Sequence, residues 1–360
     1  MMIQTSNQLP LIFKYFPDLK SNINWVSLGK TPAPVHRLEN LGYPNLWIKR
    51  TDLISPVYGG NKISRLEFIL GDVLKRGKKK VVTMGGIGSN HCLATAIFCK
   101  KLNISCRLSL YDQPVTRLVK ENLLLFYQYQ AKMKYSKTYL RFGFDHYLMQ
   151  RIKHPDEYFI QGGGSSPLGV LGVINEVFEL KKQIDKGLLP EPRYIFYPTA
   201  SNGGMAGLSL GLQLAGMKTI VMGVRVGLDK YGPLEFNTLN TVKKTMETTY
   251  KFLQRNASNI PKVKIGAPQM IEGYFGKGYG HPTSVGQEAL ELFQSKENIK
   301  LESVYTAKAC AALIDCIRAN ASSTYPILYW HTFNSVDMST KAATVDYHEL
   351  PPEFHNIFSQ

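Results

Sequence analysis

Acidic side chains are scarce in this 360-residue chain, which has 27 Asp and Glu against 43 Lys and Arg and a formal net charge of +16. An excess of this size raises the question of an anionic partner such as a nucleic acid. The basic residues are spread along the chain, however, and the densest cluster, residues 76–80, contains no aromatic residue. We therefore predict no nucleic-acid-binding surface and interpret this cluster as a solvated loop.

Long apolar runs and closely spaced cysteines are also absent. No run approaches the roughly 20 apolar residues that span a bilayer, and residues 1–7 have no basic segment followed by a long apolar stretch. We expect no signal peptide, no membrane contact and a cytoplasmic location. The five cysteines form no Cys-x-x-Cys pair and have no histidines at metal-ligand spacing, so we expect free thiols and predict no metal site.

Short β-rich runs alternate with helix-like stretches along the chain. The runs are residues 80–84, 105–111, 194–197, 219–226 and 326–330. This alternation is typical of α/β layers with mainly parallel sheets. Several runs end in turns rich in glycine and hydroxyl side chains. Because ligands bind at the carboxyl ends of parallel strands, these turns indicate where a binding site lies.

Lys62 follows the Gly59-Gly60 pair and opens an apolar, helix-like segment. A lysine amine placed where water is scarce loses the solvation of its ammonium form, so its pKa falls and it becomes a nucleophile able to form a Schiff base. The glycines allow the backbone to approach a planar ligand. Most lysines beside a glycine turn are solvated surface residues, so this motif alone does not define a function.

Two glycine-rich turns open helices after β-rich runs. In the first, Ser89 and Asn90 stand at the start of a helix, where unpaired NH groups face an anion or are satisfied by an ordinary helix cap. The second is residues 200–204, the phosphate loop. Its glycines permit several NH groups to converge, Ser201 adds a donor, and the following helix dipole favours negative charge. A tight turn without a ligand is the alternative for this loop.

Together, a Schiff-base lysine, an Asn-bearing helix start and a phosphate loop match the aldehyde, ring hydroxyl and phosphate of pyridoxal phosphate (PLP). The chain resembles the fold type II (tryptophan-synthase-β-like) PLP enzymes, in particular the branch of D-cysteine desulfhydrase and 1-aminocyclopropane-1-carboxylate (ACC) deaminase. The resemblance spans about residues 30–335. Besides the segments above, the matching motifs are Gly88-Ser89-Asn90-His91, Gly162-Gly163-Gly164-Ser165, Gly278-Tyr279-Gly280-His281-Pro282, Val304-Tyr305-Thr306-Ala307-Lys308 and His331-Thr332.

The resemblance implies roles for individual residues. Lys62 would form the Schiff base with the cofactor, and Tyr279 and Tyr305 would flank the substrate and act in catalysis. Ser89 and His91 would meet the substrate carboxylate. The substrate-binding residues implied in this way are Ser89, Asn90 and His91. The cofactor-binding residues are Lys62, Arg65, Asn90, Ala200, Ser201, Asn202, Gly203, Gly204, Thr306 and Thr332, with Asn90 on the ring hydroxyl and Arg65 as a charge partner.

Two threonines help to choose between the named activities. ACC deaminases resemble one another in having Glu and Leu where this chain has Thr306 and Thr332, and desulfhydrase-like members have Thr at both. A hydroxyl near the pyridine nitrogen does not hold a proton there as a carboxylate does, so the ring withdraws electrons less strongly. That favours elimination of a good β leaving group over opening of a cyclopropane.

The chain departs from the family pattern in two places. Phe333-Asn334 follow His331-Thr332, where relatives usually have Gly-Gly, so side chains replace bare backbone near the cofactor. The phosphate loop reads Ser-Asn-Gly-Gly-Met, where relatives often have Ser-Gly-Gly-Thr followed by His or Gln. One hydroxyl donor is thereby lost, and we expect a pocket of altered shape.

We therefore predict a two-domain, three-layer αβα enzyme with mainly parallel sheets, in which a small domain of residues 61–165 is inserted into a large domain of residues 1–60 and 166–360. The predicted reaction is α,β-elimination and deamination of a small amino acid. D-cysteine would give pyruvate, ammonia and hydrogen sulfide. The alternatives are ACC deamination to 2-oxobutyrate and ammonia, and a non-catalytic basic binding protein on the same scaffold. The resemblance also implies a homodimer.

Overall fold

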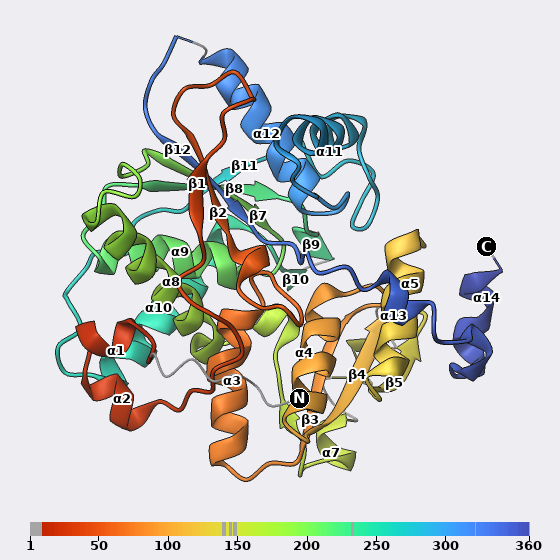
Figure 1. The fold of residues 1–360 in the computed structure, drawn as a ribbon. Helices are drawn as coiled ribbons and strands as arrows, with labels where there is room; N and C mark the ends of the chain where they lie inside the picture. The colour runs from red at the N-terminus through yellow and green to blue at the C-terminus, as the bar shows by residue number, and fades with distance from the viewer. Residues whose placement is uncertain are drawn as a thin grey trace.

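The computed structural model describes residues 9–138, 142–143, 146, 150–231, 234–320 and 322–359. Its helices and strands alternate around two separate sheets of six and four strands (Figure 1). All strand pairs within these two sheets are parallel except one. The predicted α/β class with mainly parallel sheets is confirmed.

The six-stranded sheet has the order β1-β2-β12-β7-β8-β11. Its strands are β1 (Val35–Arg37), β2 (Leu46–Arg50), β7 (Tyr194–Thr199), β8 (Ile220–Arg225), β11 (Gln269–Ile271) and β12 (Ile327–His331). Only the β1–β2 pair is antiparallel. The β-rich runs at residues 194–197, 219–226 and 326–330 correspond to β7, β8 and β12, so these three predictions are confirmed.

Helices cover both faces of this sheet. On one side lie α1 (Ile12–Tyr15), α2 (Asp18–Asn22), α8 (Pro167–Asp185), α9 (Gly203–Leu214) and α10 (Leu239–Asn256), and on the other lie α11 (Ser284–Glu297) and α12 (Thr306–Ala319). Successive side chains of a strand point to opposite faces. Accordingly, Leu328 and Trp330 of β12 pack in the first apolar core, and Ile327 and Tyr329 pack in the second. Because helices bury both faces of the sheet, the large unit has the predicted three-layer αβα arrangement.

The four-stranded sheet has the order β5-β4-β3-β6. Its strands are β3 (Lys80–Gly86), β4 (Ser105–Tyr111), β5 (Lys132–Ser136) and β6 (Tyr158–Phe159), accompanied by α4 (Asn90–Lys101), α5 (Arg117–Gln128) and α7 (Gln150–Lys153). The predicted strands at residues 80–84 and 105–111 are confirmed. A short hairpin of β9 (Lys230–Tyr231) and β10 (Leu234–Glu235) stands apart from both sheets.

The C-terminal segment packs against the smaller sheet. Buried Met338, Ala342, Phe354 and Ile357 belong to the same apolar core as the residues of β3, β4 and α5, and α13 (Ser339–Ala342) and α14 (His355–Phe358) lie near α5 in Figure 1. The predicted domain boundaries placed this segment in the large domain. Its apolar side chains cover part of the small unit, a contact between distant segments that the local sequence does not reveal.

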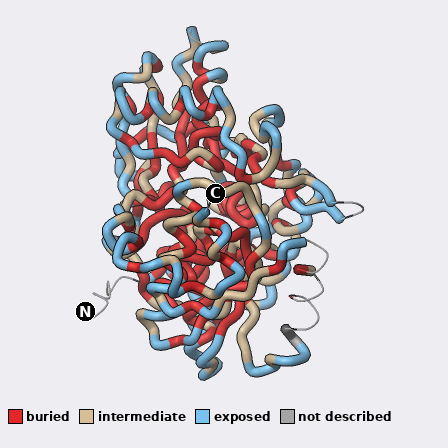
Figure 2. Tube along the Cα trace, turned by 90° about the vertical axis from the view of Figure 1, so that its right-hand side faces the viewer, coloured by how far each residue is buried: buried red, intermediate tan, exposed pale blue. Residues whose placement is uncertain are grey.

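Helix α3 (Ile63–Lys75) joins the two units. Its residue Phe68 packs in the core beneath the large sheet, and Leu66 and Leu70 pack in the core of the small sheet. Buried residues are concentrated in the middle of the molecule, and exposed residues lie mostly at its outside (Figure 2). Within the described part of the chain, none of the helices is long and apolar enough to cross a membrane.

Candidate active site

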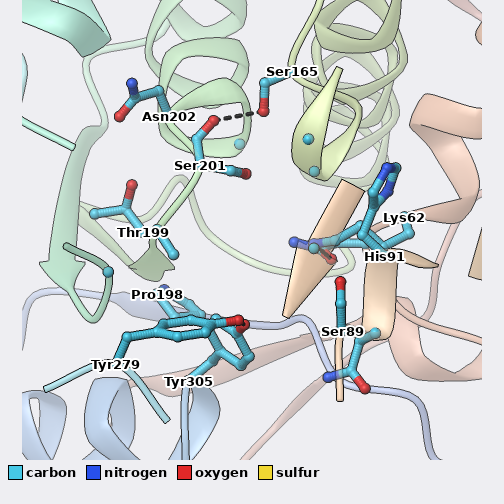
Figure 3. Close-up of a pocket in the computed structure, with 18 of the residues that line it drawn as sticks. Lys62, Ser89, His91, Ser165, Pro198, Thr199, Ser201, Asn202, Tyr279 and Tyr305 are labelled. Carbon is cyan, nitrogen blue, oxygen red and sulfur yellow. Dashed lines mark hydrogen bonds between the residues drawn. The ribbon is translucent and has the colours of Figure 1, made fainter. Parts of the chain in front are cut away.

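A cavity of about 650 Å³ lies where the carboxyl ends of strands from the two sheets meet. Its wall includes Gly85 at the end of β3, Thr199 at the end of β7 and Thr332 directly after β12. Figure 3 shows Lys62 and Ser89 across the cavity from Ser201 and Asn202, with Tyr279 and Tyr305 together along another side. The cavity is therefore where the parallel-strand rule locates a ligand.

The turn before Lys62 is packed tightly against the large sheet. A Cβ atom on Gly59 would lie 1.8 Å from the carbonyl oxygen of Asp52, so no larger residue fits there. Gly60 has a φ of +92°, a conformation that favours glycine. The backbone NH of Asn61 donates to the carbonyl oxygen of Thr332 at 3.2 Å. These contacts fix the start of α3, where Lys62 is the residue before the first helical position.

The Lys62 amine is half-buried on the cavity wall and donates to Asn61 Oδ1 at 2.8 Å. Burial lowers the pKa of Lys62 well below its usual value, and the nearby charge of Arg65 lowers it further, against the opposing charges of Glu302 and Glu176. A lowered pKa increases the fraction of neutral, nucleophilic amine at physiological pH. The structure therefore gives Lys62 the environment that its sequence motif predicted.

The phosphate loop joins β7 to α9. Asn202 has a φ of +57°, and Ser165 Oγ donates to the carbonyl oxygen of Ser201 at 2.5 Å. Ala200, Ser201, Asn202 and Gly204 line the cavity. Gly203 does not line the cavity, since it packs against Ser165, whose Oγ would lie 2.8 Å from a Cβ at position 203. The first NH groups of α9 have no partner within the helix and are available to an anion.

Arg65 lies behind this loop with only 1% of its surface exposed. Its Nη1 donates to the carbonyl oxygen of Gly163 at 2.6 Å, and its Nη2 donates to Tyr197 Oη at 3.2 Å. Its Nε has no partner among the described residues. A buried guanidinium with an unpaired donor at a cavity wall is suited to an anion, as the prediction of a charge partner requires.

The start of α4 presents Ser89 and Asn90 to the cavity. Ser89 Oγ accepts a hydrogen bond from the backbone NH of Cys92 at 3.3 Å. Burial raises the pKa of the Cys92 thiol to about 12, and a side-chain hydrogen bond with Ser89 opposes this rise. Asn90 Oδ1 accepts from Asn122 Nδ2 at 3.2 Å. This contact orients the amide nitrogen of Asn90 as a donor, which agrees with the predicted bond to a ring hydroxyl.

His91, predicted to meet the substrate carboxylate, lines the cavity and is held by Thr83. Thr83 Oγ1 donates its single proton to the carbonyl oxygen of Ile160 at 3.1 Å and therefore accepts from His91 Nε2 at 2.9 Å. Burial, with the charges of Lys62 and Arg65, lowers the pKa of His91 well below its usual value. The imidazole is thus neutral, and its unpaired Nδ1 is an acceptor rather than a donor to an anion.

Tyr279 and Tyr305 form a hydrogen-bonded pair through their hydroxyl groups on the cavity wall. Their rings cross edge to face, with centroids 6.0 Å apart. Burial raises the pKa of both hydroxyls, so both keep their protons at physiological pH. The structure thus brings the two predicted tyrosines together as a pair of potential proton donors.

Thr332 lines the cavity, but Thr306 is fully buried behind the wall. Thr306 Oγ1 accepts from the backbone NH of Glu302 at 2.7 Å. Glu302 itself lines the cavity, and its carboxylate accepts hydrogen bonds from the NH groups of Val304, Tyr305 and Thr306 at 2.7–2.8 Å. The Glu302 carboxylate therefore lies next to the Thr306 hydroxyl. The sequence argument considered this hydroxyl without a neighbouring carboxylate, so Thr306 no longer favours elimination over cyclopropane opening.

Asn334 links the loop after β12 to the turn that carries Lys62. Its Oδ1 accepts from the NH of Gly59 at 2.7 Å and from the NH of Val336 at 3.1 Å, and its Nδ2 donates to the carbonyl oxygen of Val336 at 2.9 Å. Phe333 and Asn334 both contribute to the cavity wall. The departure from the family Gly-Gly thus supplies a buried connection to the Gly59 turn.

Four functional candidates escaped the sequence analysis: Asn61, Tyr197, Glu302 and Asn334. Asn61 was visible only as part of the Gly-Gly-Asn-Lys motif, and Asn334 only as a departure from the family pattern. Tyr197 lies in a buried strand, where a tyrosine is typical of a core. Glu302 carried one signal, a carboxylate just before a helix start, where backbone NH groups need acceptors.

The sequence profile of the family described as "Pyridoxal-phosphate dependent enzyme" matches residues 26–332. The chain therefore belongs to this family of PLP-dependent enzymes. Its own residues fit the cofactor: a lysine of lowered pKa faces the cavity, and the phosphate loop has a buried guanidinium beside it with an unpaired Nε.

Individual relatives agree with the branch inferred from the motifs. A putative 1-aminocyclopropane-1-carboxylate deaminase from Thermotoga maritima is 32% identical over 315 residues, which cover 85% of this chain and 95% of that protein. A D-cysteine desulfhydrase from Salmonella paratyphi A is 30% identical over 315 residues, covering 84% and 91%. The crystal structure of an ACC deaminase homologue matches with a TM-score of 0.77 at 27% identity, covering 94% of this chain and 99% of the other.

Proposed function

We propose that this enzyme eliminates a β substituent from a small amino acid and deaminates the product, as a D-cysteine desulfhydrase does. One observation carries the proposal: the Lys62 amine, with its lowered pKa, shares one cavity with the protonated Tyr279–Tyr305 pair. A neutral amine accepts a proton, and a protonated hydroxyl delivers one. These are the two proton transfers that a β-elimination requires.

The position of each side chain in the cavity assigns it a separate step of the proposed reaction. Ser89 and the first NH groups of α4 would hold the substrate carboxylate, because Ser89 lines the cavity and a helix start favours negative charge. Lys62 Nζ would accept the proton from the α-carbon. Tyr279 or Tyr305 would protonate the departing thiolate, since both hydroxyls retain their protons. Bound PLP supplies an electron-withdrawing ring that stabilises negative charge at the α-carbon.

D-cysteine and water would thus give hydrogen sulfide, pyruvate and ammonia. The identity of 30% with a D-cysteine desulfhydrase supports this substrate. The family resemblance supports a homodimer acting in the cytoplasm as part of the proposal. Light scattering on the purified protein tests the assembly.

ACC deamination is the second candidate, and Glu302 favours it. Its carboxylate lines the same cavity next to Thr306, so the site does not lack an acidic group on this side. Burial raises the pKa of Glu302 against three backbone hydrogen bonds that lower it. A carboxyl group with a raised pKa holds its proton more strongly, and a protonated Glu302 would stabilise negative charge on the ring of bound PLP. The resemblance to a putative ACC deaminase supports the same candidate.

Product analysis separates the two candidates. Purified enzyme with PLP is incubated separately with D-cysteine, L-cysteine and ACC, and pyruvate, sulfide and 2-oxobutyrate are measured. The proposal predicts pyruvate and sulfide in equal amounts from D-cysteine. Turnover of ACC alone would establish the second candidate. No product from any of these substrates, in a protein that binds no PLP, would instead support a non-catalytic role.

The variant Lys62→Ala tests whether the Lys62 amine binds the cofactor and takes part in the reaction. The variant should lose activity and the borohydride-trapped cofactor adduct on the peptide that contains residue 62. Lys75→Ala is the matched control, because Lys75 is exposed at the opposite end of the same helix. An active Lys62→Ala variant would refute the assignment of this amine.

A further inference from the structure

The phosphate loop lacks a side chain at position 204, where relatives often have threonine. The structure shows why glycine is required in this chain. A Cβ atom on Gly204 would lie 1.9 Å from Tyr197 Oη and 2.6 Å from Arg65 Nη2. Contacts this short are incompatible with any side chain while Tyr197 and Arg65 stay in place. The Tyr197 hydroxyl thus occupies the space that a side chain at position 204 would fill.

Tyr197 reaches this position from the sheet. It belongs to β7, its ring packs in the core between the sheet and α8 and α9, and only 3% of the residue is exposed. It nevertheless contributes to the cavity wall beside the phosphate loop. Its hydroxyl is therefore the polar end of a core residue that reaches a ligand-binding cavity, a frequent use of buried tyrosines.

The hydrogen bonds of the Tyr197 hydroxyl leave its proton free. Asn61 Nδ2 donates to Tyr197 Oη at 2.6 Å, and Arg65 Nη2 donates to the same oxygen at 3.2 Å. Asn61 must face Tyr197 with its nitrogen, because its Oδ1 accepts from the Lys62 amine. A hydroxyl accepts two hydrogen bonds and donates one. Both acceptor positions are used, and the proton of Tyr197 has no acceptor among the described residues.

Arg65 gives independent evidence for an anion at the same place. It is 99% buried, since its exposed fraction is 1%, and it forms no ion pair with any described carboxylate. Its Nε has no hydrogen-bond partner in the described part of the chain. A buried, unpaired charge is costly unless a counterion is bound. The start of α9 beside it adds NH groups and a favourable dipole.

We propose that the Tyr197 hydroxyl, held by Asn61 and Arg65, donates a hydrogen bond to the cofactor phosphate and replaces the threonine hydroxyl that the loop lacks. The proposal rests on the assignment of residues 200–204 as the phosphate site. The Tyr197 hydroxyl can hold its position only beside glycine at position 204, and the loop with Gly204 depends on Tyr197 for its hydroxyl donor. We call these two residues the dependent pair. The proposal also connects the phosphate site to Lys62 through the Asn61 side chain.

Cofactor binding tests this directly, without measuring turnover. PLP and pyridoxal, which has no phosphate, are titrated into cofactor-free protein and followed by absorbance. Loss of one hydrogen bond to a charged group should raise the PLP dissociation constant of Tyr197→Phe about tenfold or more. The pyridoxal constant should change much less, because pyridoxal has no phosphate to lose the bond. The phosphate resonance in ³¹P NMR of the bound variant should also shift from that of wild type.

Tyr43→Phe is the matched control. Tyr43 is equally buried, and its hydroxyl donates to the carbonyl oxygen of Tyr325 at 3.0 Å in the core on the α11–α12 side. It should leave both dissociation constants unchanged. If Tyr197→Phe leaves PLP affinity unchanged, or weakens pyridoxal as much as PLP, the proposal is refuted. Inactivity toward D-cysteine with a tenfold PLP effect would instead refute only the proposed reaction.

A pair of swaps covers the case in which Tyr197→Phe does not fold. Gly204→Thr alone should prevent PLP binding, because its side chain overlaps the Tyr197 hydroxyl. The double variant Tyr197→Val, Gly204→Thr removes the overlap with Tyr197, so that only the flexible end of the Arg65 side chain has to move, and it restores the family threonine. It should bind PLP more tightly than Gly204→Thr by at least tenfold. A double variant that binds no better than the single one would overturn the dependent pair.

Discussion

Asn334 is expected to stabilise the turn that carries Lys62, and its replacement by alanine provides a quantitative test. The side chain makes three hydrogen bonds with Gly59 and Val336 and is 7% exposed. At about 1 kcal/mol for each bond, Asn334→Ala should lower the free energy of unfolding by about 3 kcal/mol. The buried NH of Gly59 also loses its acceptor, which makes this figure a lower estimate.

Urea unfolding of the holoenzyme measures the effect. With a slope of about 3 kcal/mol per molar urea, the midpoint should fall by about 1 M. The loosened turn should also lower kcat more than it raises KM, because the Lys62 amine loses its fixed position while the carboxylate-binding end of α4 is untouched.

Asn256→Ala is the control for Asn334→Ala. Asn256 Nδ2 donates a single hydrogen bond to the carbonyl oxygen of Phe252 at 2.8 Å, at the end of α10. This variant should lose about 1 kcal/mol and keep its kinetic constants. An Asn334→Ala protein with an unchanged midpoint would show that the link to Gly59 contributes nothing and that the reasoning is wrong.

Three further predictions concern buried ionisable groups. Because the folded state lowers the pKa of Lys62, cofactor-free Lys62→Met should be more stable to urea than wild type at pH 7, with a gain that shrinks as the pH rises towards 10.5. Burial lowers the pKa of His331 from 6.5 to about 4. As the pH falls from 6.5 to 4, the free energy of unfolding of wild type should therefore decrease by about 3 kcal/mol more than that of His331→Gln. Tyr279→Phe and Tyr305→Phe should each break the shared hydrogen bond; the one that loses about a hundredfold in kcat, with unchanged cofactor absorbance, identifies the proton donor.

Local sequence patterns were sufficient for the residues whose roles depend on their immediate neighbours. Lys62 was identified because two glycines precede it and an apolar helix follows it, and the structure confirms both the tight turn and the helix. A helix start at Ser89 and Asn90 was predicted, with an anion or an ordinary cap as alternatives, and Ser89 Oγ does accept from the NH of Cys92. For Ser89 the determining contact lies within three residues, whereas the turn before Lys62 is also held by the distant Thr332.

The remaining site residues depend on contacts between distant segments. Asn334 reaches Gly59 across 275 positions, and Asn61 reaches Tyr197 across 136. No local pattern distinguishes such an asparagine from a solvated one. The tautomer of His91 also depends on a distant segment, because its partner Thr83 donates to the carbonyl oxygen of Ile160, which belongs to a later part of the small unit.

The same long-range contacts explain how this chain could differ from its family at the cofactor. Losing the hydroxyl at position 204 removes a donor, but it also creates the space that Tyr197 fills. Tyr197 then accepts from Asn61, and Asn61 accepts from Lys62. Groups at the two ends of the proposed cofactor site are therefore joined by one amide side chain. A change in the phosphate loop should consequently alter the Lys62 environment, even though the two segments lie about 140 positions apart in the sequence.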